Sequence, residues 1–196
     1  MGGPAHVDGH AVKHTDNFYL RAPMVVNGQA WPTCEHYFQA MKFADATGVF
    51  ARATSRDDER ERLDYQEKIR KAESPGASWA LGQTRGVRLR RDWELVKGHI
   101  MYEGVKAKYE QYPELAAELV ATRGPIRAAP STADWQRKNS AILERVREEL
   151  RPAAERDDEK LKELVSIIEP AYGVDDVAST AAAPADRHQQ GPFVAK

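Results

Sequence analysis

Residues 31–43 read Trp31-Pro32-Thr33-Cys34-Glu35-His36-Tyr37-Phe38-Gln39-Ala40-Met41-Lys42-Phe43, a run that sets one acid among aromatic side chains. Thr33 follows a proline and opens an apolar run with helical spacing, which is typical of a helix N-cap. Glu35 then lies in the first turn of the predicted helix. The helix dipole favours its ionised form, whereas crowding by aromatic rings favours the neutral acid.

Steps of three and four residues from Glu35 lead to Phe38, Gln39 and Lys42. An acid, an amide and an ammonium group on one helix face could contact a common ligand, so this face is a candidate site. In the simpler alternative, Glu35 is an acid that the first turn of a helix favours, without any catalytic role. Spacing alone does not separate these two interpretations.

The flanking sequence predicts a mainly helical fold. Asn27-Gly28 favours a tight turn, so residues 24–31 are expected to form a β-hairpin that leads into the helix. Charge-rich residues 51–73 predict a solvated helix or a surface insertion, and Ser74-Pro75 predicts the start of another helix. Asp92 is expected to cap a long helix that ends near Pro113, and further amphipathic helices follow. Five to seven helices with one hairpin indicate a single α+β domain, mainly helical, and not a parallel sheet.

The chain divides into four ranges by composition and pattern. Residues 1–14 are expected to be a flexible N-terminus, 15–151 the folded domain, 152–172 a C-terminal helix and 173–196 a disordered tail rich in small and polar residues. His6, His10 and His14 have the spacing of a helical metal site, but the glycines around them argue against a helix. We therefore expect no metal site.

The composition excludes several classes of function. The 29 Lys and Arg residues against 30 Asp and Glu residues give a net charge of −1, so no overall field would hold the chain on nucleic acid or an anionic membrane. The single cysteine, Cys34, is expected in the core. No secretory signal or membrane span is evident, so a cytoplasmic location is expected. Dinucleotide, P-loop and standard zinc motifs do not occur, and we expect no cofactor.

Residues 84–91, Thr84-Arg85-Gly86-Val87-Arg88-Leu89-Arg90-Arg91, carry four arginines and no acid. The planar guanidinium fork suits phosphate oxygens, and the glycine allows close approach of the backbone. This segment is the best candidate for a phosphate site. Its alternative is an ordinary solvated surface.

Four blocks of sequence resemble the NADAR family, also called the YbiA-like family. They are Asn17-Phe18-Tyr19, residues 27–43, the stretch from Ala80-Leu81-Gly82 through Leu89-Arg90-Arg91-Asp92-Trp93 to Met101, and Lys106-Ala107-Lys108-Tyr109. The second block is highly specific and the third nearly so. Together they cover about residues 15–151.

This resemblance implies a YbiA-like fold and an N-glycosidase that cleaves the bond between a ribose and a base-like amine. The substrate classes it implies are ribosylaminopyrimidine phosphates and ADP-ribose attached to guanine in nucleic acid. Glu35 resembles the catalytic glutamate of the family and Trp93 its active-site tryptophan, which could stack on the leaving base. The expected substrate-binding residues are Asn17, Tyr19, Trp31, Gln39, Lys42, Arg85, Arg90 and Arg91. The expected partner is a small nucleotide-like substrate or ADP-ribosylated nucleic acid, and no membrane.

The chain also departs from the family pattern. Gln83 stands where members usually have arginine, and the usual N-terminal strand is expected to be shortened or absent. In residues 126–140 the family acid is replaced by Ala128 or Ala129 and the glycine-rich loop is missing, although Asp134, Trp135 and Asn139 could be shifted remnants. These losses keep open a non-catalytic binder of ADP-ribose or a nucleotide. A helical scaffold led by residues 152–169 is a third, weaker alternative.

Overall fold

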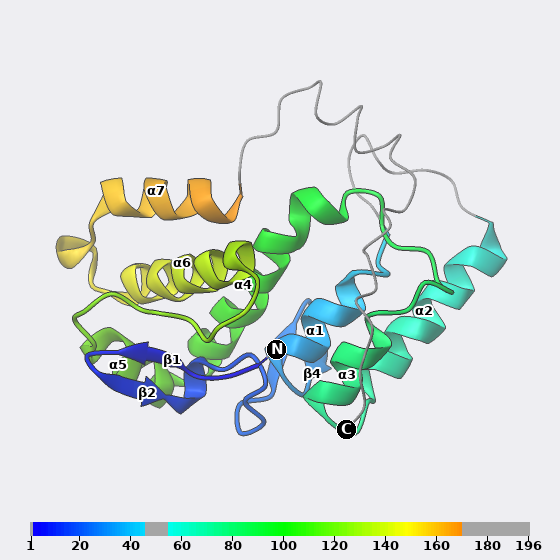
Figure 1. Cartoon of the computed structure of the whole chain (residues 1–196), viewed down its shortest axis with the longest axis horizontal. Helices are drawn as coiled ribbons and strands as arrows, with labels where there is room; N and C mark the ends of the chain where they lie inside the picture. Colours follow the sequence, from blue (N-terminus) through cyan, green and yellow to red (C-terminus); the bar gives the residue numbers. More distant parts are fainter. Residues whose placement is uncertain (1, 46–54, 170–196) are drawn as a thin grey trace, which may run out of the picture.

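The fold of the protein, seen in a computed structural model, is described for residues 2–45 and 55–169 (Figure 1). Within these ranges seven α-helices and two small two-stranded sheets occur, which confirms the mainly helical α+β class. The helices are α1 (Cys34–Met41), α2 (Arg56–Arg70), α3 (Pro75–Leu81), α4 (Trp93–Gln111), α5 (Pro113–Ala121), α6 (Ala133–Leu150) and α7 (Asp158–Ile168). The predicted tail 173–196, residues 170–172 and residues 46–54 lie outside the described residues. No described helix has the length and apolar character that a membrane span needs.

The hairpin and the helix after it form as the sequence predicts. Strands β3 (Met24–Val26) and β4 (Gln29–Trp31) pair antiparallel, and Asn27 and Gly28 both have positive φ angles of 51° and 77°. Both turn residues are therefore in the left-handed region that a tight primed turn requires. Helix α1 follows, and the Thr33 hydroxyl accepts a hydrogen bond from the backbone N–H of His36, which confirms the predicted N-cap.

A second hairpin occupies the segment that was expected to be flexible. Strands β1 (Ala5–Val7) and β2 (His10–Val12) pair antiparallel around Asp8 and Gly9, which both have positive φ. The Asp8 carboxylate accepts hydrogen bonds from the backbone N–H groups of Arg123 (2.9 Å) and Gly124 (2.7 Å). An Asp-Gly turn fixed by a distant loop explains why this hairpin forms. The N-terminal strand that was expected to be shortened or absent is β1, a strand of three residues.

Helix α4 is the central element, because it packs against both α1 and α6 (Figure 1). It begins at Trp93, but Asp92 makes no side-chain capping bond to it. Instead, Asp92 accepts hydrogen bonds of 2.6 and 2.8 Å from Arg90, two residues earlier. The expected role of Asp92 as a cap is therefore wrong, because the guanidinium group competes for both carboxylate oxygens.

Helix α6 lies between α4 and α7, and α7 covers its outer side in Figure 1. Thr132 caps α6, because its hydroxyl accepts a hydrogen bond from the backbone N–H of Trp135. At the other end of the domain, α2 buries little besides Arg62 and Ile69, as expected for a solvated helix. The core between these layers is apolar and includes Cys34, which is buried as predicted.

Candidate active site

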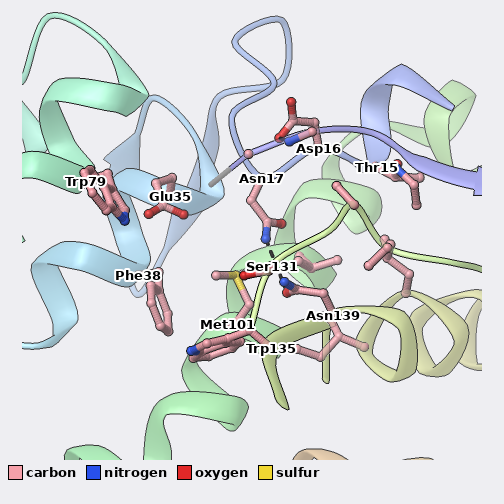
Figure 2. Close-up of a pocket in the computed structure, with 18 of the residues that line it drawn as sticks. Thr15, Asp16, Asn17, Glu35, Phe38, Trp79, Met101, Ser131, Trp135 and Asn139 are labelled. Carbon is pink, nitrogen blue, oxygen red and sulfur yellow. Dashed lines mark hydrogen bonds between the residues drawn. The ribbon is translucent and has the colours of Figure 1, made fainter. Parts of the chain in front are cut away.

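A cavity of about 390 Å³ opens between α1, α3, α6 and the N-terminal segment (Figure 2). Its volume is within the range of small-ligand sites. Five segments far apart in the sequence build its walls: residues 2–17, 35–42, 79–83, 101–105 and 128–143. Its polar and aromatic lining residues are Thr15, Asp16, Asn17, Glu35, Phe38, Gln39, Lys42, Trp79, Gln83, Ser131, Thr132, Trp135 and Asn139.

Glu35 is held in this cavity by the start of α1. Its backbone N–H donates a 3.0 Å hydrogen bond to the carbonyl of Asn17, which ties the helix to the N-terminal wall. Its side chain is only 7% exposed, and Nε2 of Gln39 donates to Oε1 at 2.7 Å. The carboxyl group is therefore buried and oriented by one amide, while it still lines the cavity.

Burial raises the pKa of Glu35 above its ordinary value, because the charged form loses hydration. The hydrogen bond from Gln39 and the positive charge of Lys42 oppose that rise. Burial also lowers the pKa of Lys42 to about 8, although Glu35 favours its charged form. The cavity thus holds an acid and an amine that can both change protonation closer to neutral pH than usual, which suits proton transfer.

The N-terminal wall carries a second acid, Asp16. Its Oδ1 accepts hydrogen bonds of 2.9 Å from the backbone N–H groups of both Gly3 and Phe18. Next to it, Nδ2 of Asn17 donates to Oδ1 of Asn139 on α6 at 3.4 Å. These contacts fix the positions of polar groups on facing walls, as Figure 2 shows for Asn17 and Asn139.

A buried ammonium group supports this wall from behind. Lys108 on α4 is 1% exposed, and its Nζ donates to the carbonyl of His14 at 2.6 Å and to that of Asp16 at 3.4 Å. Burial lowers the pKa of Lys108. Its role in the fold is to anchor the backbone that carries Asp16 and Asn17.

The aromatic residues predicted from the sequence lie outside the cavity lining. Trp93 is 8% exposed and packs on Phe38 with ring centroids 5.0 Å apart, while Nζ of Lys42 lies 5.8 Å from its ring. Trp31 packs edge-on against Tyr37 at 5.4 Å. Tyr19 is partly buried against the core. In this geometry Trp93 supports two lining residues, Phe38 and Lys42, and does not itself face the cavity.

The predicted arginines also lie outside the lining. Arg90 is bound to Asp92 by two hydrogen bonds. Arg85 is exposed and donates to the carbonyls of Gln83 and Thr84. Arg91 lies two residues before the start of α4 and does not line the cavity either. Of the charged side chains, Asp16, Glu35 and Lys42 line the cavity in the described part of the chain.

The structure brings Asn17, Glu35, Gln39 and Lys42 together from the predicted set, and it adds residues that sequence reasoning missed. Asp16 directly precedes the Asn17-Phe18-Tyr19 block, and its position was the available signal. Trp79 lies one helical turn before Gly82 of the third block. Of the suggested remnants, Trp135 and Asn139 line the cavity, whereas Asp134 is exposed and pairs with Lys138.

The described residues contain no cluster of three His, Cys, Asp or Glu side chains that could hold a metal ion. The His14 ring instead hydrogen-bonds Tyr109 through Nδ1 at 2.9 Å, and Glu118 lies 3.2 Å from Nε2. His6 lies on β1 and His10 on β2. The polar groups that line the cavity are carboxyl, amide, amine and hydroxyl groups.

Comparison with known proteins finds relatives that match part of this chain. N-glycosidase YbiA of Escherichia coli (strain K12) is 40% identical over 100 residues, which are 51% of this chain and 52% of that protein. Riboflavin biosynthesis protein PYRR, chloroplastic, of Zea mays is 34% identical over 111 residues, 54% of this chain and 16% of that protein. The matched region spans about half the length of the YbiA relatives.

A solved structure supports the same grouping. The NMR structure of the E. coli protein YbiA superposes with a TM-score of 0.50 and 32% sequence identity, and the match covers 69% of this chain and 76% of that one. The family model described as NADAR domain matches residues 7–151. That range is most of the chain and contains β2 to α6, with all of the cavity-lining residues except Gly2, Gly3 and Ala5. The chain belongs to the NADAR domain family.

Proposed function

We propose that this protein hydrolyses the C–N bond between a ribose and a base-like amine, with Glu35 as the catalytic acid-base group. The observation that carries the proposal is the buried Glu35 carboxyl group in the wall of a cavity, oriented by Gln39 at 2.7 Å. The kinship with proteins named N-glycosidase supports the reaction class.

The reaction that this arrangement suits begins with stretching of the bond from ribose C1′ to nitrogen. Positive charge then develops on the sugar, and an ionised Glu35 beside it would stabilise that charge. The oxygen of a water molecule adds to C1′, Glu35 accepts one of its protons, and the bonding electrons leave with the nitrogen. The proton then passes to the leaving amine, so that Glu35 returns to its ionised state.

For the substrate, we propose ADP-ribosyl-guanine in nucleic acid or a ribosylaminopyrimidine phosphate. The relative named as a riboflavin biosynthesis protein supports the second. Lys42 is the cation that the described lining offers to an anionic group, and exposed Arg85 donates a hydrogen bond to the carbonyl of Gln83, a lining residue. A phosphate is therefore expected on the side of the cavity that carries Lys42 and Gln83.

The test compares the protein with Glu35→Gln on an ADP-ribosyl-guanine oligonucleotide and on ribosylaminopyrimidine phosphate, with released base measured by chromatography. Glu35→Gln should lower kcat/KM by about 10²–10⁴-fold, because the amide cannot accept the proton. Glu159→Gln, an exposed residue on α7, is the matched control and should keep full activity. Equal turnover by Glu35→Gln, or none by the native protein on either substrate, contradicts the proposal.

The alternative is a non-catalytic binder of ADP-ribose or a nucleotide. One observation favours it: the wall formed by residues 126–132 presents Ala128 and Ala129 to the cavity where the family pattern has an acid. Calorimetry with ADP-ribose separates the two. Binding without turnover by the native protein supports the binder, and turnover that depends on Glu35 excludes it.

A further inference from the structure

Trp79 differs from the other tryptophans of the chain. It is 42% exposed and lines the cavity, whereas Trp31 and Trp93 are 5% and 8% exposed and lie outside it. Four further large hydrophobic residues are similarly exposed in the described part of the chain, and none of them lines this cavity. What distinguishes Trp79 is its place in the lining, where its exposed indole offers an aromatic surface to a bound ligand.

The close approach of α3 to α1 places Trp79 there. A Cβ atom at Gly82 would lie 1.9 Å from Oε1 of Gln39, so the absence of a side chain is what lets the end of α3 reach α1. Nζ of Lys42 closes the same contact with a 3.1 Å hydrogen bond to the carbonyl of Gly82. Trp79 lies three residues before Gly82, and this approach therefore brings its indole to the wall that carries Glu35 (Figure 2).

The indole of Trp79 is also uncovered. In the described residues it makes no ring–ring pair and no cation–π contact, in contrast to Trp135 across the cavity. Phe38 packs edge-on against Trp135 with ring centroids 5.1 Å apart, and Nζ of Lys97 lies 5.9 Å from the centroid of the Trp135 ring. Trp135 is thus held by its neighbours, while Trp79 retains an open aromatic surface.

We propose that Trp79 is a specificity residue that stacks on a planar aromatic base, so that the cavity selects ribosyl substrates with a nucleobase-like leaving group over those with a non-aromatic amine. The role of the base as a leaving group rests on the proposed function, whereas the stacking of Trp79 on a base does not. Stacking uses the face of the ring and needs no charged partner. The charged residues of the described lining, Asp16, Glu35 and Lys42, therefore remain available for the sugar and the phosphate.

The test measures binding by calorimetry with two probes, guanosine 5′-monophosphate and ribose 5-phosphate, which differ by the base. The native protein should bind the nucleotide about 5- to 100-fold more tightly, the range expected for one stacked base. Trp79→Ala should bind both probes about equally, and Trp79→Phe should recover part of the preference. Leu89→Ala, another exposed apolar residue that does not line the cavity, should behave like the native protein.

The proposal is overturned if Trp79→Ala keeps the preference, or if the native protein binds neither probe or both equally. Its failure is separable from that of the hydrolase assignment. If Trp79→Ala loses the base preference and no N-ribosyl substrate is turned over, the stacking role of Trp79 is supported and the hydrolase assignment is excluded. If turnover depends on Glu35 but not on Trp79, and no base preference is seen, the hydrolase assignment is supported and the stacking role is excluded.

Discussion

Gln39 donates a 2.7 Å hydrogen bond from its Nε2 atom to Oε1 of Glu35, one helical turn earlier on α1. Both side chains are buried in the cavity wall. Burial raises the pKa of Glu35, and this bond stabilises the ionised carboxylate and opposes that rise. The amide therefore helps to set the pH at which the proposed catalytic group ionises.

Replacing Gln39 by methionine removes this bond and keeps the length of the side chain. The pKa of Glu35 should rise further, because the ionised form loses a donor. A reaction that needs the carboxylate would then require a higher pH, so the acid limb of the kcat/KM profile should move to higher pH. Gln66→Met is the control, since the Gln66 amide bonds the Phe43 carbonyl away from the cavity. An unmoved acid limb in Gln39→Met contradicts this role.

Glu35→Gln should make the fold more stable as pH rises. The pKa of Glu35 is raised above 4.5 by burial, so at pH well below 4.5 the carboxyl is neutral in both the folded and the unfolded state and costs nothing. Above 4.5 the unfolded state ionises more readily, which favours unfolding of the native protein but not of the variant. Thermal unfolding should show equal Tm values in acid and an advantage of about 2–4 °C for the variant near neutral pH. A difference in Tm between the two proteins that stays constant at all pH values would contradict the raised pKa of Glu35.

Gly82→Ala should damage both stability and activity. The added Cβ would lie 1.9 Å from Oε1 of Gln39, so the amide or the end of α3 must move. The cost of such overpacking is about 1–3 kcal/mol in unfolding free energy, measurable by urea denaturation. Gly76→Ala on the same helix is the control, because its Cβ would meet no atom closer than 3.9 Å. It should be neutral or stabilising, by up to about 1 kcal/mol.

The docking of α7 should weaken in mild alkali. His99 on α4 lies 3.5 Å from Glu103 and 3.0 Å from Glu169, which follows α7 and also pairs with Arg145. The hydrogen bond with Glu103, and then that with Glu169, raise the pKa of His99 to about 9. This stabilisation is complete below pH 6.5 and is lost as pH rises through about 9.

Hydrogen exchange of the α7 amides, corrected for the intrinsic pH dependence, measures this loss. Protection should fall between about pH 7 and 9.5 in the native protein, while Arg145 retains part of the contact with Glu169. His99→Gln cannot gain the charge, so its protection should be lower and flat over the same range. Equal pH dependence in the two proteins would exclude His99 as the cause.

Local signals in the sequence account for much of the fold. Thr33, Ser74 and the Asn27-Gly28 turn are short-range devices, and each forms the predicted contact or conformation. Asp92 failed as a cap because Arg90, two residues earlier, offers its carboxylate two charged donors. The Asp8-Gly9 turn carried the same signal as Asn27-Gly28, but the surrounding glycines and histidines obscured the short strands beside it.

The cavity was harder to predict, because its walls come from distant segments. Helical spacing placed Glu35, Gln39 and Lys42 on one face, and all three line the cavity. Asp16 and Trp79 reach it through contacts that no local pattern encodes, namely the Lys108 anchor and the close approach at Gly82. Trp93 was assigned by resemblance, whereas the arginines were also suggested by the acid-free composition of residues 84–91, and the proposed roles of both stay predictions.

The wall on the N-terminal side depends on partners that lie late in the chain. His6 and Arg127 exchange two backbone hydrogen bonds of 2.8 and 2.9 Å, and Asn17 meets Asn139, 122 residues further on. Contacts between residues so far apart in the sequence form slowly, and during translation the later partner leaves the ribosome well after the earlier one. A nascent chain therefore carries Glu35 with no enclosed pocket around it until synthesis has passed α6, so competence for ligand depends on the later half of the domain.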